Sequence, residues 1–148
     1  MRYSKKLNLY RDHNVTFNPE SCRACSYDWW RFVDRKRGLV LFNTFSYGRA
    51  FNKHHEEVRD VLAKLGIRVD IEINCPVGLQ DIDAVVSYYR NQIETLSKAK
   101  GKKWTRTRKN LEREQLIAHY KTVLEKLEPV VDRTITEIEG GKVVNGGA

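Results

Sequence analysis

The sequence predicts an α+β fold: a small antiparallel sheet with one packed helix, followed by a long antiparallel helical hairpin. Three observations predict it. Two strand-like segments flank a short charged turn between residues 27 and 47, apolar residues then recur at helical spacing over 49–65, and two longer amphipathic segments follow residue 80. A length of 148 residues, 41% of them hydrophobic and 31% charged, is typical of one folded domain.

The expected sheet begins at residue 27. Residues 1–26 are polar and weakly patterned, which predicts an N-terminal arm with one short strand at Val15–Phe17. The aromatic segment 27–33 and the apolar segment 39–47 predict two strands. The turn Asp34–Gly38 is short, so these strands should pair antiparallel.

A helix and a third strand complete a core over residues 27–79. The helix is expected over 49–65, with Gly66 in the position of a C-cap glycine. Apolar and polar residues alternate over Ile67–Ile73, which predicts a strand with one buried and one solvated face. Pro76 follows this strand and should end it.

The amphipathic pattern of residues 80–128 predicts the helical hairpin. Asp81 is a good cap for its first helix, and the second runs from about Thr107 to Glu128, where Pro129 should stop it. The tail 129–148 is expected to be mobile. The apolar stripes of the hairpin exceed what a small sheet covers, so we expect a homo-oligomer through the hairpin.

Positive charge is concentrated in two blocks. Residues 1–55 carry 11 basic and 4 acidic side chains, residues 56–97 carry 4 and 8, and residues 98–128 carry 10 and 4. The formal net charge is +8. Such blocks attract anionic partners, although surface charge that only maintains solubility is the alternative.

The first candidate binding site is a strand-to-helix junction. A helix N-terminus presents unpaired N–H groups to a phosphate, a glycine lets the backbone approach, and an arginine can grip two oxygens. A neighbouring tyrosine could stack on a base. The residues concerned are Ser46, Tyr47, Gly48, Arg49 and Lys53. The alternative is a plain turn with a solvated arginine, since no complete phosphate-loop motif is present.

The second candidate binding site is the basic connection between the two hairpin helices. Seven of the twelve residues 98–109 are basic and none is acidic, with a tryptophan among them. This composition is typical of segments that hold phosphates and stack a base. The candidate residues are Lys102, Lys103, Trp104, Arg106 and Arg108. A solvated loop is the alternative.

Metal binding and catalysis are the weaker hypotheses. Cys22 and Cys25 form a CxxC pair, but no second pair follows, so free thiols are expected and no cofactor or metal. His54 and His55 could serve a metal-free nuclease as acid and base. One of them lies on an apolar face, as a core histidine does, and no catalytic spacing is present. We therefore expect no enzyme.

The aromatic segment 27–33 has two sides. As a strand it places Tyr27, Trp29 and Arg31 on one side, and Trp30 and Phe32 on the other. One side must be core, and the other can leave a ring beside arginines at the surface, where cation–π contact and base stacking are available.

The layout of a small sheet followed by two long helices, over about residues 27–128, resembles phage anti-defence proteins that sequester cyclic nucleotide signals, such as the first Thoeris anti-defence family. That resemblance implies capture of a nucleotide signal in the host cytoplasm.

The leading hypothesis is a non-enzymatic protein that captures a phosphate-bearing ligand. A basic DNA- or RNA-binding protein and an inhibitor of an acidic protein are the alternatives. Three cysteines are no disulfide framework, the start has no apolar signal region, and no run of about 18 apolar residues occurs. We therefore expect a cytoplasmic protein without a membrane partner.

The basic connection generates the first testable prediction. Changing Lys102, Lys103, Arg106 and Arg108 together to alanine should weaken the binding of an anionic ligand and barely alter the melting temperature, because solvated charges contribute little to packing. Ligand titration and thermal denaturation of the variant check this. Unchanged affinity would contradict the role given to this connection.

Overall fold

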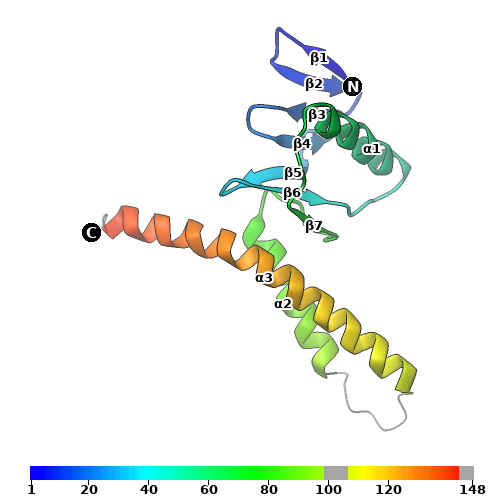
Figure 1. The fold of residues 1–148 in the computed structure, drawn as a ribbon, viewed down its shortest axis with the longest axis vertical. Coiled ribbons are helices and arrows are strands. Elements are labelled where there is room, and N and C mark those ends of the chain that lie inside the picture. The colour runs from blue at the N-terminus through cyan, green and yellow to red at the C-terminus, as the bar shows by residue number, and fades with distance from the viewer. Residues whose placement is uncertain (99–106, 144–148) are drawn as a thin grey trace. The chain divides into compact units, whose positions relative to one another are not determined.

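The computed structural model describes residues 1–98 and 107–143, and in the second range the side chains of residues 112–131. The chain divides into two compact units, Met1–Asp81 and Ile82–Ala148. The first contains seven strands and one helix, and the described residues of the second form two helices (Figure 1). The predicted α+β class is confirmed.

The sheet has its strands in chain order, β1 to β7. The first six form an antiparallel meander, and the predicted pairing of β5 with β6 is confirmed. Their turn is only Arg37–Gly38, shorter than the predicted Asp34–Gly38, and β6 ends at Asn43 and not at residue 47. The seventh pairs parallel with β6, which differs from the wholly antiparallel sheet that we expected. The reason is the connection: the chain leaves β6, passes through a helix and returns in the same direction. The strands are β1 (Arg2–Ser4), β2 (Leu9–Asp12), β3 (Val15–Asn18), β4 (Arg23–Ser26), β5 (Trp30–Lys36), β6 (Leu39–Asn43) and β7 (Ile71–Ile73).

The N-terminal arm is the largest departure from the sequence prediction. Residues 1–26 form the four strands β1–β4. Each has only three or four residues, too few to display an alternating pattern. Tight turns join them, and Asn8 and Cys22 adopt positive φ angles of 56° and 57° there. Pairing between neighbouring strands, which a local pattern does not reveal, creates this part of the sheet.

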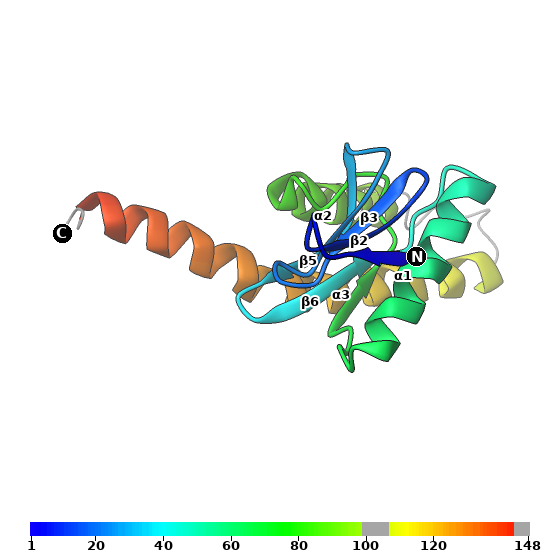
Figure 2. The same ribbon diagram turned by 90° about the horizontal axis from the view of Figure 1, so that it is seen from above.

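Helix α1 (Arg49–Lys64) packs against one face of the sheet (Figures 1 and 2). It begins and ends within a residue of its predicted bounds. Gly66 has a φ of 70°, and two hydrogen bonds, from Ile67 N to Leu62 O and from Gly66 N to Ala63 O, close the helix end. This is a Schellman motif, so the predicted C-cap glycine is confirmed. The core beneath α1 contains Val15, Phe17, Ala24, Trp30, Phe32, Val33, Phe42, Phe51, Val58, Val61 and Leu62.

The predicted strand Ile67–Ile73 is shorter than its alternation suggested, because only its last three residues pair as β7. Asp70 directly precedes this strand and forms two hydrogen bonds with Val40. Its backbone N–H donates to the Val40 carbonyl, and its carboxylate accepts the Val40 N–H at 2.8 Å. These bonds hold the beginning of β6 against the segment that leads into β7.

The second unit is the predicted antiparallel helical hairpin, α2 (Ile82–Lys98) and α3 (Thr107–Val143). Tyr89 packs edge-on against Tyr120 at 5.4 Å, and Arg90 donates to Glu128 at 2.9 Å. Neither of these described helices is long and apolar enough to cross a membrane. Oligomerisation through the hairpin stays a prediction.

The predicted helix end at Pro129 is wrong, since α3 continues through it to Val143. A proline inside a helix leaves the carbonyl four residues earlier without its donor. Here that carbonyl belongs to Glu125, and both residues are exposed, so water can hydrate the freed oxygen. Val130 and Val131, directly after the proline, are buried and favour continuation of the helix.

The interrupted helix generates a second prediction. Pro129→Ala should raise the melting temperature, because it restores the hydrogen bond to Glu125 and relieves a penalty of up to about 3 kcal/mol. Thermal unfolding followed by circular dichroism measures this. Lys126→Ala, also exposed on α3, serves as the control and should change little. A lower melting temperature for the proline variant would contradict the continuous helix.

Candidate ligand-binding site

The predicted strand-to-helix junction lies between β6 and α1. Gly48 is the N-cap of α1, and its φ of 153° is a conformation that L side chains rarely adopt. No side chain caps the helix, and its first turn contains no acidic residue. The N–H groups at this end of α1 are therefore not neutralised by a side chain, as an anion site requires.

Ser46 plays a different part from the one expected. Its hydroxyl accepts the Gly48 N–H at 3.1 Å and donates to the Gly48 carbonyl at 2.8 Å. The hydroxyl therefore shapes the turn, and its proton is already used. Arg49 and Lys53 are exposed, and neither forms an ion pair with a described residue.

Aromatic rings surround this junction. Tyr47 packs edge-on against Phe45, Trp30 and Phe51, with ring centroids 4.9, 5.3 and 5.4 Å away. The ring of Trp29 meets Trp30 at 5.6 Å. The network also includes Tyr27 and His54, which pack together at 5.5 Å beside Phe51. We call these seven rings the ring cluster: Tyr27, Trp29, Trp30, Phe45, Tyr47, Phe51 and His54.

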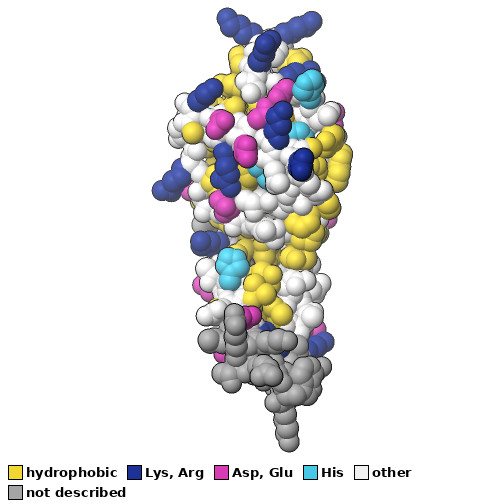
Figure 3. Space-filling view, turned by 90° about the vertical axis from the view of Figure 1, so that its right-hand side faces the viewer, with side chains coloured by type: hydrophobic (Ala, Val, Ile, Leu, Met, Phe, Trp, Pro, Cys, Tyr) yellow, Lys and Arg dark blue, Asp and Glu magenta, His cyan; other side chains and the backbone are white. Residues whose placement is uncertain are grey.

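The outer rings of the ring cluster are accessible. Tyr47 is 60% exposed, Trp29 57% and Tyr27 40%, whereas Trp30 and Phe51 are buried beneath them. Figure 3 looks onto the side that carries α1 and shows hydrophobic side chains gathered along one edge. The prediction that the rings of segment 27–33 divide between core and surface is confirmed, but the predicted strand over the whole segment is wrong. Strand β5 begins at Trp30, and the exposed rings Tyr27 and Trp29 lie in the turn before it, where Tyr27 has a φ of 54°.

The ring cluster also contains an unsatisfied donor. The indole Nε1 of Trp30 is buried and has no hydrogen-bond partner among the described residues. The Tyr47 hydroxyl, in contrast, donates to the Pro76 carbonyl at 3.2 Å, which fixes this exposed ring in place. An exposed ring that is already ordered loses little side-chain entropy when a ligand stacks on it.

The two histidines are buried. His54 Nδ1 lies 2.8 Å from the hydroxyl of Ser26, and His55 packs against Phe32 and Phe42. Burial lowers the pKa of His54, and it lowers the pKa of His55 from 6.5 to about 4. Ser26 is fully buried, so a substrate cannot reach the Ser26–His54 pair. Both histidines act as core residues in this arrangement.

The CxxC cysteines point away from each other. Cys22 is buried in the core beneath α1, whereas Cys25 lies in β4 opposite Thr16, on the other face of the sheet. Burial raises the pKa of both thiols and raises the pKa of Cys75 to about 11. Within the described part of the chain, no three His, Cys, Asp or Glu side chains cluster as metal ligands.

The predicted basic connection falls mostly outside the described residues. Lys102, Lys103, Trp104 and Arg106 lie there, and of Arg108 only the backbone within α3 is described. Lys98, at the end of α2, pairs with Glu94 at 2.9 Å.

A buried carboxylate was missed by sequence reasoning. Asp34 in β5 is fully buried and forms ion pairs with Arg23 at 3.0 Å, Arg31 at 3.1 Å and Lys36 at 3.6 Å. The sequence placed Asp34 in a charged turn. Only the pairing of β4 with β5 brings Arg23 to it, although the local spacing of Arg31, Asp34 and Lys36 was visible.

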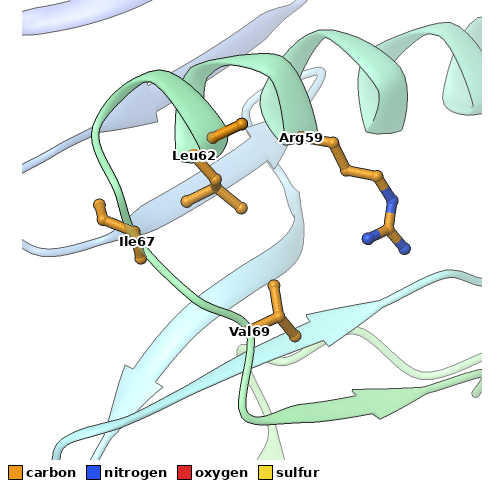
Figure 4. A pocket seen from close by; sticks show the side chains of 5 residues that line it. Arg59, Leu62, Ile67 and Val69 are labelled. Carbon is orange, nitrogen blue, oxygen red and sulfur yellow. The ribbon is translucent and has the colours of Figure 1, made fainter.

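A pocket of about 250 Å³ lies near the C-terminal half of α1 (Figure 4). Its one charged group, Arg59, is already engaged: the guanidinium lies 3.4 Å from Glu72 and 4.1 Å from the centre of the Phe42 ring. The rest of the lining is apolar. The pocket therefore offers a phosphate no free cation. Its lining residues are Arg59, Leu62, Ala63, Ile67 and Val69.

Comparison of the chain with models of protein families, with curated proteins and with solved structures finds no match. Its function is therefore inferred from its own residues.

The buried histidines generate a third prediction. His55 has a lower pKa in the folded chain than in the unfolded chain, so unfolding takes up a proton as the pH falls below about 6.5. The melting temperature should therefore decrease from pH 6.5 towards pH 4. His55→Leu should weaken this dependence, because the leucine does not titrate. Thermal denaturation across this pH range tests it.

His13→Gln, an exposed histidine of the same unit, serves as the control and should keep the dependence of the unchanged chain. An identical pH profile for the His55→Leu variant would show that His55 does not carry the effect.

Proposed function

We propose that this chain is a non-enzymatic binding protein for a nucleotide or for the nucleotides of a nucleic acid. The observation that carries the proposal is the meeting of three exposed rings with the uncapped N-terminus of α1. Ring faces stack on bases of any sequence, and helix N–H groups favour phosphate. The two halves of a nucleotide thus find complementary groups within one short stretch of surface.

Arg49 and Lys53 supply the charge in this arrangement. Both lie in the first turns of α1, are exposed and have no carboxylate partner among the described residues. A guanidinium can hold two phosphate oxygens at once, which a surface lysine does less specifically. Arg49 is therefore the phosphate ligand, with Lys53 adding attraction, and Tyr47 and Trp29 are the stacking rings.

The site is an open surface. Tyr47 and Trp29 expose more than half of their surface, whereas drug-sized ligands are usually enclosed by their pockets. This favours a partly exposed nucleotide, such as one within a nucleic-acid chain. Capture of a cyclic nucleotide signal, as the layout resemblance implies, stays a prediction, and cyclic AMP belongs among the probes.

Arg49→Ala should weaken the binding of AMP at least tenfold, which is about 1.4 kcal/mol, because the phosphate loses its bidentate partner. Titration followed by intrinsic tryptophan fluorescence, to which the exposed Trp29 ring contributes, measures the dissociation constant. Lys64→Ala removes one charge from the last turn of the same helix and should have little effect. Equal losses in the two variants would indicate general attraction only.

The stacking half of the site is tested with ribose 5-phosphate, which lacks the base. It should bind more weakly than AMP to the unchanged chain, and Tyr47→Ala should remove most of that difference. If AMP and ribose 5-phosphate bind with equal affinity, the rings contribute nothing to binding, and the proposed stacking of the base is wrong.

A further inference from the structure

One face of the sheet carries a row of residues that crosses five strands. Strand pairing places Arg2 opposite Arg11 and Arg11 opposite Thr16, and it continues through Cys25 to Arg31. Directly opposite residues on neighbouring strands share a face. We call these five residues the arginine row, since three of them are arginines and the other two are uncharged.

The arginine row lies on the face opposite α1. Phe17 directly follows Thr16 in the sequence, and Ala24 directly precedes Cys25. Both Phe17 and Ala24 are fully buried in the core with α1. Successive side chains of a strand point to opposite faces. Thr16 and Cys25, and with them the whole row, therefore face away from α1.

Further cations share this face. Arg23 and Lys36 join Arg31 around the buried Asp34 carboxylate, with nitrogen–oxygen distances of 3.0 to 3.6 Å. The Asp34 carboxylate neutralises only one of these three positive charges. Its ion pairs also hold the charged groups of the three side chains in defined positions. Within the seven strands, this face carries one carboxylate against five cations, which are Arg2, Arg11, Arg23, Arg31 and Lys36.

Arg2 and Arg11 carry the strongest argument. Both are exposed, they lie directly opposite each other on β1 and β2, and neither forms an ion pair with a described residue. Like charges in this arrangement destabilise a sheet. A phosphate between them would turn the repulsion into two favourable contacts, because each guanidinium can donate two hydrogen bonds to phosphate oxygens.

The length of the row selects a polymer. Neighbouring strands lie about 4.8 Å apart, so the four steps from β1 to β5 span about 19 Å. Consecutive phosphates of a nucleic-acid strand lie much closer together than this distance, so more than one phosphate of the same strand fits along the row. A free mononucleotide occupies only a fraction of it. Arg31 at one end lies two residues from Trp29, whose ring is 57% exposed.

We propose that the arginine row binds the phosphate backbone of a single-stranded nucleic acid. This deepens the proposed function, and rests on it for the stacking of a base on Trp29. The single strand is favoured because its bases are free to stack on exposed rings, whereas those of a duplex are not.

The test uses the full chain and a fluorescently labelled 20-nucleotide oligothymidylate, with binding measured by anisotropy at 50 and 200 mM salt. Arg2→Gln combined with Arg11→Gln should weaken binding at least tenfold at 50 mM salt. It should also reduce the magnitude of the negative slope of log K against log salt by about 1.4, because two contacts to the phosphates of a single strand are lost. Circular dichroism should show a folded chain, since both side chains are exposed.

Lys5→Gln combined with Lys6→Gln is the matched control. It removes two exposed charges from the turn of the same hairpin, outside the row, and should weaken binding less than threefold. Equal losses in the two double variants would overturn the proposal, as would equal affinity for a 20-base-pair duplex. Equal competition by polyglutamate of similar length would instead indicate an acidic protein partner, and would also overturn it.

Arg49→Ala separates this proposal from the proposed function. We call the candidate site of Tyr47 and Arg49 at the start of α1 the α1 site. If the Arg2/Arg11 variant loses affinity for the oligonucleotide and Arg49→Ala and Tyr47→Ala do not, binding at the arginine row is supported and binding at the α1 site is contradicted. If only the Arg49 and Tyr47 variants lose affinity, the α1 site stands and the arginine row fails.

Discussion

The packing of α1 against one face of the sheet is the constraint on which the first unit depends. Phe17, Val33 and Phe42 are fully buried beneath it, and burial of each such side chain contributes about 1.5 to 3 kcal/mol. A strand alternates its side chains between two faces, so these buried residues also fix the direction of their neighbours. The positions of Thr16 and Cys25 on the opposite face follow from the burial of the core.

The same packing orders the candidate site at the start of α1. Phe51 is buried in the core and contacts both Trp30 and Tyr47, so the first turn of the helix and the exposed ring are held by one set of contacts. Gly48 begins the helix with a conformation that other residues rarely adopt. The exposed rings and the helix end that we propose to bind a phosphate therefore have a fixed geometry before a ligand arrives, which would reduce the entropy lost on binding.

Sequence reasoning succeeded where a pattern was long and local. Helical periodicity over residues 49–65 predicted the 16-residue α1, and a short turn between apolar segments predicted the pairing of β5 with β6. It failed where structure depends on distant partners. Strands of three or four residues show too little alternation, so β1, β2 and β4 were missed, whereas the short strand predicted at Val15–Phe17 is β3. The register that aligns Arg2, Arg11 and Arg31 was missed with them. The residues of the α1 site could be named in advance because they are consecutive in the chain.

The buried Asp34 carboxylate affects both the stability of the sheet and the arrangement of its positive charges. A fully buried carboxylate is costly unless it is paired, and Arg31 alone would satisfy the charge. The chain instead places Arg23 and Lys36 around it as well. Because Arg23 is half-exposed, its ion pair gives little net stability, so stability alone is a weak reason for a third cation. Ordered positive charge beside the half-exposed Arg23 side chain has a clearer physical use in the binding that we propose, since it lowers the cost of arranging cations for an anionic ligand. The carboxylate that secures β5 thereby also holds part of the surface that we assign to phosphate.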